Sequence, residues 1–480
     1  MASKRLIALF TGMMLGQQAG AAELQLSDVL AQIITAHPKV MAMREQGAQA
    51  QAKIDKADAA FDPYFSQKVS SRVSGYYSGD VLTTGVSKPL AFMNGEVFTQ
   101  YQLADGDFPV YEAEYETLSA GEFRVGISLS LLQGRDTDAR RTGLQTARLS
   151  LQEWQARYNA SVNDQLYVAT STYLKWYESS LKLKALGEMT TALKAGETAL
   201  KRRVEQGDAA RIALDDYQNS LLEVELLKAD TEQAQAIALA KLRYFMTSPG
   251  TLAAPGEHRP DWPFLLNETR IGDLRRALNG HPLQVSMQAG LNKQQAEYDL
   301  ARNNLLPKLD MQASVGRDVG SGVKSLEGTE TKVGLSFSYP LGNRKARAEE
   351  SALAAKVREV QFKIEDLRQK LIQQFDANVA NWQQSKKVLD LRQQARALAE
   401  RLQNAERTRF NAGDADMFIL NARQTKLIKA RMDAIKAHVA RRQAELDLYY
   451  AAAALDSALA THDTSMHTPG LPIDLSGAES

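Results

Sequence analysis

The feature that most constrains the fold of this chain is an internal repeat. A strand-like segment at residues 125–134 (VGISLSLLQG) returns 208 residues later at residues 333–342 (VGLSFSYPLG). In both copies, apolar residues alternate with small polar ones, the segment ends at a Gly, and a long helical pattern without proline follows. Self-similarity of this kind is typical of duplicated supersecondary units, so we expect the two halves to fold alike.

The repeat extends on both sides of the strand. A His-Pro pair stands 26 residues before a further proline in each half, within residues 37–63 and 281–307. Beyond the long helical pattern, residues 203–208 (RVEQGD) match residues 409–414 (RFNAGD). Each half therefore predicts the order helix, strand, strand, long helix, Gly-Asp turn and helix.

These matches set the predicted boundaries. The chain divides into a signal peptide at 1–22, a first repeat at 23–246, a Pro-rich connector at 247–267, a second repeat at 268–455 and a mobile polar tail at 456–480. In the first repeat we expect strands at about 64–78 and 121–133, a long helix at about 138–206 and a turn at 207–208. In the second we expect strands at about 308–319 and 330–340, a long helix at about 344–411 and a turn at 413–414.

The first residues resemble a secretory signal. Lys4 and Arg5 precede an apolar run at 6–15 and small residues at 19–22, which is the pattern of an export signal. A buried N-terminal helix is the alternative. No other segment has 18 consecutive apolar residues, so we expect no membrane-spanning helix and an exported mature chain.

The predicted strands are two-faced. Their apolar positions fall on one side, and in the second strand of each half these are Phe123, Val125, Ile127, Leu129, Val333, Leu335, Phe337 and Tyr339. A soluble sandwich and a membrane barrel both alternate in this way; in a barrel the apolar side faces lipid. Export and strands of about ten residues favour the barrel. Four strands cannot close a barrel alone, and unpaired strand edges are not tolerated in lipid. Three copies of the chain would supply 12 strands.

Residues 79–121 are harder to interpret. We expect a long loop here, although Asn94-Gly95 is a hairpin signal and apolar residues alternate after it. The sequence leaves open whether residues 80–104 form a further hairpin.

The helical segments have matched lengths. Each long helix would extend about 100 Å at 1.5 Å per residue, and the two shorter helices of the same half together approach that length. We therefore expect each short pair to stack end to end, antiparallel to the long helix, and to build a helical wall.

The sequence offers no reaction chemistry. It has no Cys, its six His form no ligand pattern, and it lacks phosphate-binding and nucleophile motifs. The net charge of +1 gives no reason to expect a nucleic-acid partner. We therefore predict neither an enzyme nor a metal or cofactor site. The rival interpretations are a periplasmic coiled-coil adaptor or scaffold without a pore and, less favoured, an exported hydrolase.

Over residues 24–455 the chain resembles the TolC-type outer-membrane efflux protein family. The resemblance rests on the two His-Pro helices, on the strands that end at Gly134 and Gly342, and on the turns at 203–214 and 409–420. It implies a mainly α-helical homotrimer with a 12-stranded β-barrel in outer-membrane lipid and a long α-barrel in the periplasm. It also implies a passive exit duct for efflux or type I secretion, docked by a periplasmic adaptor and an inner-membrane transporter.

The resemblance also assigns roles to the turns. It implies that they are periplasmic tips that contact the adaptor, through Arg203, Gly207, Asp208, Arg409, Gly413 and Asp414. Some family members place gate carboxylates six and nine residues after the second Gly, where this chain has Ile419 and Ala422. Asp414 and Asp416 are the candidate replacements, although Asp414 is also a plausible helix cap.

Overall fold

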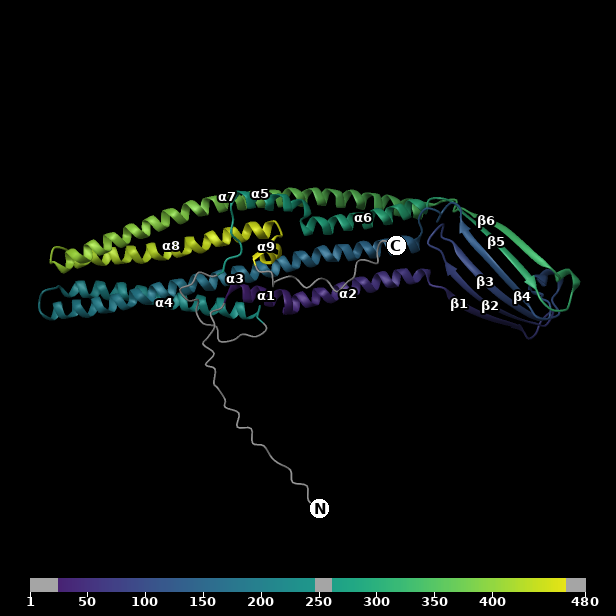
Figure 1. The fold of residues 1–480 in the computed structure, drawn as a ribbon, viewed down its shortest axis with the longest axis horizontal. Coiled ribbons are helices and arrows are strands. Elements are labelled where there is room, and N and C mark those ends of the chain that lie inside the picture. Colours follow the sequence, from purple (N-terminus) through teal and green to yellow (C-terminus); the bar gives the residue numbers. More distant parts are fainter. Residues whose placement is uncertain (1–24, 247–260, 463–480) are drawn as a thin grey trace, which may run out of the picture.

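The protein forms a long rod with a β-sheet at one end (Figure 1). The computed structural model describes residues 25–246 and 261–462. The expected signal peptide, residues 247–260 of the expected connector and residues 463–480 of the expected tail lie outside this part. Within it, no helix is both long and apolar enough to cross a bilayer.

The helices and strands follow the duplicated order. The first half contains α1 (Leu26–Ala36), α2 (Pro38–Asp58), β1 (Tyr64–Arg72), β2 (Gly79–Pro89), β3 (Glu96–Gly106), β4 (Glu122–Ser130), α3 (Ala139–Glu205) and α4 (Arg211–Arg243). The second contains α5 (Glu268–Ala277), α6 (Pro282–Asn303), β5 (Lys308–Asp318), β6 (Thr329–Ser338), α7 (Arg344–Asn411), α8 (Met417–Ala451) and α9 (Leu455–His462).

The helical wall has the predicted arrangement. The long helix α3 packs along α2 and α4, and α7 packs along α6 and α8. Contacts of α3 with α6 and α8 join the two halves side by side. The α3–α4 and α7–α8 connections lie together at the end of the rod opposite the sheet (Figure 1).

The sheet differs from the four-strand prediction. It contains six strands in the order β1-β2-β3-β4-β5-β6, all antiparallel to their neighbours. The four expected strands are present, and the additional pair is β2–β3, where we expected a long loop. The first half therefore carries two strands more than the second, so the duplicated unit is not symmetric in its sheet.

The turn between β2 and β3 explains this difference. The amide of Gly95 donates to the carbonyl of Phe92 at 2.8 Å, and Met93 and Asn94 have φ of 49° and 45°. Positive φ at both central residues defines a type I′ turn, which matches the twist of a hairpin. The amide of Ser130 then donates to the carbonyl of Met93 at 2.9 Å and ties the turn to the end of β4.

The main core lies at mid-length, where the short helices meet. It includes the apolar face of α1, with Leu26, Leu30 and Ile33 fully buried. Residues that we had assigned to linkers also contribute. Trp262 and Phe264 of the expected connector are buried. The expectation of a mobile tail is wrong for residues 456–462, because they continue α9, which buries Ala458 and Leu459.

The two His-Pro pairs have equivalent roles in this core. His37 and His281 are the N-caps of α2 and α6, and each Nδ1 accepts from the backbone amide two residues later, at 3.3 and 3.2 Å. Both rings are buried, and burial lowers the pKa of each imidazole below its ordinary value of 6.5. A neutral imidazole is therefore part of both helix starts.

A buried ion-pair network anchors the second half. Glu445 is 4 % exposed; it pairs with Arg441 at 3.3 Å and Arg442 at 3.0 Å and accepts from the indole of Trp262 at 2.8 Å. Arg441 also donates to the carbonyl of Trp382 at 2.9 Å and lies over its ring. One carboxylate thus connects α8, α7 and the segment before α5.

We predict that Glu445→Ala destabilises the protein by about 2 kcal/mol, because it leaves the half-buried guanidinium groups of Arg441 and Arg442 and the buried indole of Trp262 without their acceptor. Thermal unfolding followed by circular dichroism in detergent measures this. The control is Glu359→Ala, which removes an exposed carboxylate paired with Lys356 and Lys363 on α7 and should leave the midpoint unchanged. Equal midpoints for both variants would contradict the structural role of Glu445.

We also predict a histidine-dependent loss of stability in acid. Because folding lowers both pKa values, the unfolded chain binds protons more readily than the folded one. The stabilisation is therefore complete above about pH 6.5 and is lost as pH falls below it. The His37→Asn, His281→Asn double variant keeps a capping side chain that does not titrate. Its unfolding midpoint should fall less than that of the wild type between pH 7.5 and 5; parallel curves would refute the prediction.

Candidate functional site

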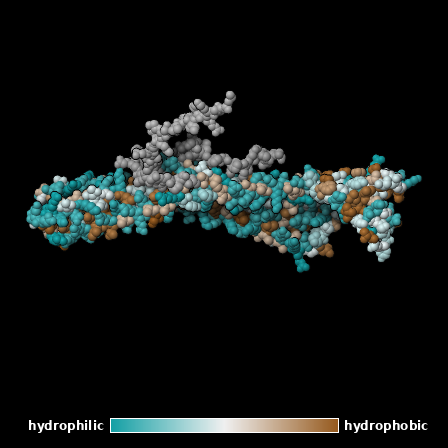
Figure 2. All heavy atoms as spheres, turned by 90° about the horizontal axis from the view of Figure 1, so that it is seen from below, coloured by the Kyte–Doolittle hydropathy of each residue, from teal (hydrophilic) through white to brown (hydrophobic). Residues whose placement is uncertain are grey.

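The sheet carries a continuous apolar face. Direct pairing places Phe65, Val86, Thr99, Val125, Val315 and Thr331 in one row across all six strands. Phe65 and Phe337 are 65 % and 67 % exposed. Figure 2 shows hydrophobic surface at the sheet end of a largely hydrophilic rod. An exposed apolar surface of this kind indicates contact with a membrane or a protein partner.

The opposite face of the sheet is small and polar. The adjacent row contains Ser66, Gly85, Gln100, Arg124, Gly316 and Glu330. The guanidinium of Arg124 donates to the Ser314 hydroxyl at 3.2 Å and also pairs with Glu122 and Glu330. Gly316 leaves the space that this group occupies, because a Cβ there would meet Arg124 and Glu122. This face therefore suits contact with water.

The structure places the predicted lipid-facing residues with some differences. Phe123, Val125, Val333, Leu335 and Phe337 are exposed on the apolar face. Ile127 and Leu129 are on the same face but half-buried; a Cβ at Gly95 would contact Leu129, so the hairpin turn lies against it. Tyr339 follows the last residue of β6 and lies outside the strand.

The two tip turns have the same backbone geometry. Gly207 and Gly413 have φ of 84° and 85°, in the left-handed region that favours Gly. The amides of Asp208 and Asp414 donate to the carbonyls of Arg203 and Arg409 at 2.8 and 2.9 Å. These are Schellman ends, in which a left-handed residue closes the helix.

The matched arginines at the tips do different things. Arg409 donates to the carbonyl of Asp414 at 3.1 Å and pairs with Glu406 at 3.3 Å. Both partners belong to the same helical hairpin, α7–α8. Arg203 instead lies over the ring of Phe410, 5.0 Å from its centroid. The repeat places Val204 where the second half has Phe410, so only one arginine can make the contact between hairpins.

The capping prediction for Asp414 was wrong. Asp208 and Asp414 close the preceding helices through their backbones, and α4 begins at Arg211 with Ala210 as its N-cap. The N-cap of α8 is Asp416, whose carboxylate accepts from the amide of Phe418 at 3.1 Å. Asp414 and Asp416 are both exposed at the same tip.

Two further contacts at the tips were not found from the sequence. Asn421 on α8 donates to the Ser220 hydroxyl on α4 at 2.8 Å and thus joins the two hairpins. Tyr217 is buried against α3, where Gly196 leaves room for its hydroxyl group, and burial raises the pKa of this phenol. Only the pairing of a helical Gly with an aromatic residue across the turn could have suggested the second contact.

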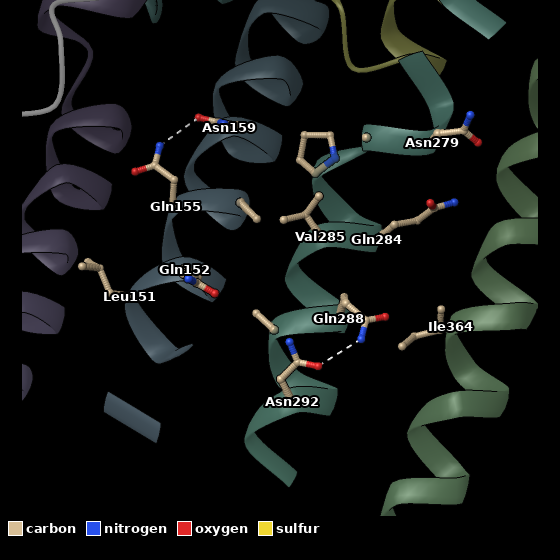
Figure 3. A pocket seen from close by; sticks show the side chains of 14 residues that line it. Leu151, Gln152, Gln155, Asn159, Asn279, Gln284, Val285, Gln288, Asn292 and Ile364 are labelled. Carbon is tan, nitrogen blue, oxygen red and sulfur yellow. Dashed lines mark hydrogen bonds between the residues drawn. The ribbon is translucent and has the colours of Figure 1, made fainter. Parts of the chain in front are cut away.

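A groove of about 570 Å³ lies between α3 and α6, bordered by Ile364 of α7 (Figure 3). Amide side chains dominate it, and the figure shows two amide pairs within single helices, Gln155 with Asn159 and Gln288 with Asn292. Its lining contains no acid, base or nucleophile. The described residues also contain no group of three or more potential metal ligands.

A long helical wall joined to a two-faced antiparallel sheet is the fold of outer-membrane channel proteins. Among the solved structures that share it is CusC, with TM-score 0.65 and 14 % identity, covering 92 % of this chain and 95 % of that chain. VceC of Vibrio cholerae has TM-score 0.65 and 13 % identity, covering 89 % of this chain and 96 % of that chain. CmeC of Campylobacter jejuni has TM-score 0.62 and 12 % identity, covering 94 % of each chain. Identities this low show the fold alone.

The sequence itself is informative in the second half. Residues 274–454 match the family model described as outer membrane efflux protein. It is also 30 % identical over 213 residues to Protein CyaE of Bordetella pertussis. That alignment covers 42 % of this chain and 43 % of the relative, so the chain matches less than half of the length of this curated protein. The mainly α-helical fold with a sheet portion and the family resemblance are thereby confirmed.

We predict that Gly196→Ala loosens the tip, because its Cβ would lie 2.1 Å from the hydroxyl oxygen of Tyr217. Hydrogen exchange of the amides in α4 should accelerate near residue 217. The matched control is Gly187→Ala on the same helix, where a Cβ meets nothing within 4 Å; there alanine should stabilise the helix by about 1 kcal/mol. Faster exchange in both variants, or in neither, would contradict the packing argument.

Proposed function

We propose that this protein is the outer-membrane exit duct of a tripartite efflux or type I secretion system. Substrate would pass from the periplasm or from an inner-membrane pump to the exterior without a catalytic step in this chain. The observation that carries the proposal is the two-faced sheet, whose apolar face is exposed and whose polar face is lined with small residues. That arrangement suits a wall between lipid and an aqueous lumen.

The sheet edges support closure by several chains. β1 and β6 form the two edges of the sheet. β1 runs away from the helices, as it follows α2, whereas β6 runs towards them and leads into α7. The β6 edge of one chain can therefore pair antiparallel with the β1 edge of the next. Such head-to-tail contacts generate rings, and the family resemblance implies a ring of three.

The helices also present two different edges. Exposed apolar residues on α7 recur at helical spacing, at Val388, Leu391, Leu398 and Leu402. The helix α4 lies at the opposite edge of the helical wall from α7, and its exposed apolar residues include Leu222, Leu226 and Ile237. Basic side chains predominate in α7 from Lys386 onwards, and acidic ones predominate in α4. These edges suit α7 of one chain packing against α4 of the next.

The tips supply the proposed partner surface. A helical wall of 67 residues in α3 extends about 100 Å, which would project the tips into the periplasm. We propose that the turns at Gly207-Asp208 and Gly413-Asp414, with Arg203 and Arg409, contact a periplasmic adaptor, and that the energy comes from the inner-membrane transporter. Export through the signal peptide at 1–22 belongs to the same proposal.

The candidate gate residues remain Asp414 and Asp416. Threefold symmetry would bring three copies of each exposed carboxylate to one ring. Because Asp416 already caps α8, Asp414 is the carboxylate with no capping role. Gathered like charges would attract cations to this ring.

We predict that Ile127→Asp or Phe337→Asp prevents outer-membrane assembly, because a carboxylate on the lipid face costs free energy. Ser128→Asp and Ser338→Asp are the matched controls, since they add the same charge on the opposite face of the same strands. Membrane fractionation should show loss of the first two proteins and retention of the controls. Normal insertion of Ile127→Asp and Phe337→Asp would overturn the assignment of faces.

The overall proposal is tested by the molar mass of the detergent-extracted protein, from light scattering with the detergent mass subtracted. Three chains per particle are expected. A monomer that is soluble after osmotic shock would instead favour the periplasmic scaffold.

A further inference from the structure

The hairpin β2–β3 raises the number of strands that each chain would contribute to the proposed wall. We propose that this hairpin is part of the membrane wall, so that three chains close a barrel of 18 strands rather than 12. The inference rests on the proposed function, since it concerns the wall of the same duct. It concerns residues 79–106, where the sequence did not decide between a loop and a hairpin.

The hydrogen-bonded register is the first argument. β1 pairs with β2 along the whole length of β1, and β3 pairs with β4 from Glu96 to Gln102. The turn is fixed to the end of β4 by the amide of Ser130 and the carbonyl of Met93. The hairpin therefore separates β1 from β4, which would be neighbours in a four-stranded sheet.

The two faces are the second argument. Leu82 lies between Val69 and Leu103, and Val97 is opposite Ile127, so the apolar face continues through the hairpin. On the other face, Gly85 and Gln100 continue the polar row from Ser66 to Arg124. A shift of one residue would reverse both faces, so the hairpin has the register that a lipid-facing wall requires.

The third argument is strand length and charge. β2 and β3 have 11 residues each, against 9 to 11 in the other strands, and a tilted strand needs about 9–11 residues to span a bilayer. On the apolar face Asp80 is opposite Asp105 at one end of the hairpin, and Lys88 lies at the other. The charges thus border an apolar band, where lipid headgroups and water would meet them.

The consequence is a wider outer end. Barrel diameter grows roughly linearly with strand number, so 18 strands give a wall about 1.5-fold wider than 12. Barrels of 16 to 18 strands leave an aqueous channel. The lumen would be lined by the small and polar row of the sheet, which suits passage of hydrophilic cargo.

Disulfide mapping tests the proposal, because the chain has no Cys of its own. Two double variants join proposed neighbours: Ser70→Cys with Val81→Cys across β1–β2, and Thr99→Cys with Val125→Cys across β3–β4. The control, Ser66→Cys with Ser128→Cys, places one Cys on β1 and one on β4. In the structure these strands are three strand spacings apart, about 14 Å, which is too far for a disulfide. A fourth set pairs Ser336→Cys on β6 with Cys at Ser66, Lys68 or Ser70 on β1, to link neighbouring chains.

Oxidation is carried out on the full-length protein in outer-membrane vesicles, with gel mobility as the readout. Cross-linking of both neighbour pairs, none in the β1–β4 control and covalent trimers in the β6–β1 set would support an 18-stranded wall. Covalent trimers together with a β1–β4 cross-link would overturn it and leave the duct intact. Absence of covalent oligomers in every β6–β1 register would instead refute closure between chains, and with it the proposed function.

Discussion

The structure depends on the packing at mid-length, where two short helices meet end to end beside each long one. Such a junction interrupts the helical wall and exposes helix ends. Here α1, α5 and α9 pack around it, and the buried rings of His37 and His281 cap the helices that restart towards the sheet. His37 also contacts Tyr244 and Phe245 at the end of α4. Beyond this core, the helices towards the tips share a smaller buried apolar cluster.

The two ends of the rod follow opposite principles. At the tips, a small buried apolar cluster that includes Leu214 and Leu420 lies between the helices. Polar and aromatic contacts such as Asn421 with Ser220 and Arg203 with Phe410 join the two helical hairpins, and the outer surface is exposed to water. In the sheet, backbone pairing fixes one register, and the exposed apolar row requires an apolar environment. A chain with one end suited to water and the other to lipid is in keeping with a duct between two compartments.

Much of this could be predicted from the repeat, because periodicity and turn residues report local structure. The strands with clean alternation and the long helices are of this kind. The sequence did not decide whether residues 80–104 form a hairpin, because Gly79, Gly85, Pro89 and Gly95 are typical of loops. In the structure the turn is made by Met93 and Asn94. The expected cap at Asp414 was wrong because the Schellman closure uses its backbone amide. Arg203 with Phe410, and Tyr217 with Gly196, depend on tertiary contacts that no local pattern reports.

The hairpin has a topological consequence. Because it adds one strand in each direction, β4 still runs towards the helices and α3 still leaves the sheet on the same side. An insertion of a single strand would have sent the rest of the chain to the opposite side of the wall. An insertion of two strands therefore leaves the directions of all later strands and helices unchanged. A duplicated chain can in this way change the width of its sheet while its helices keep their places.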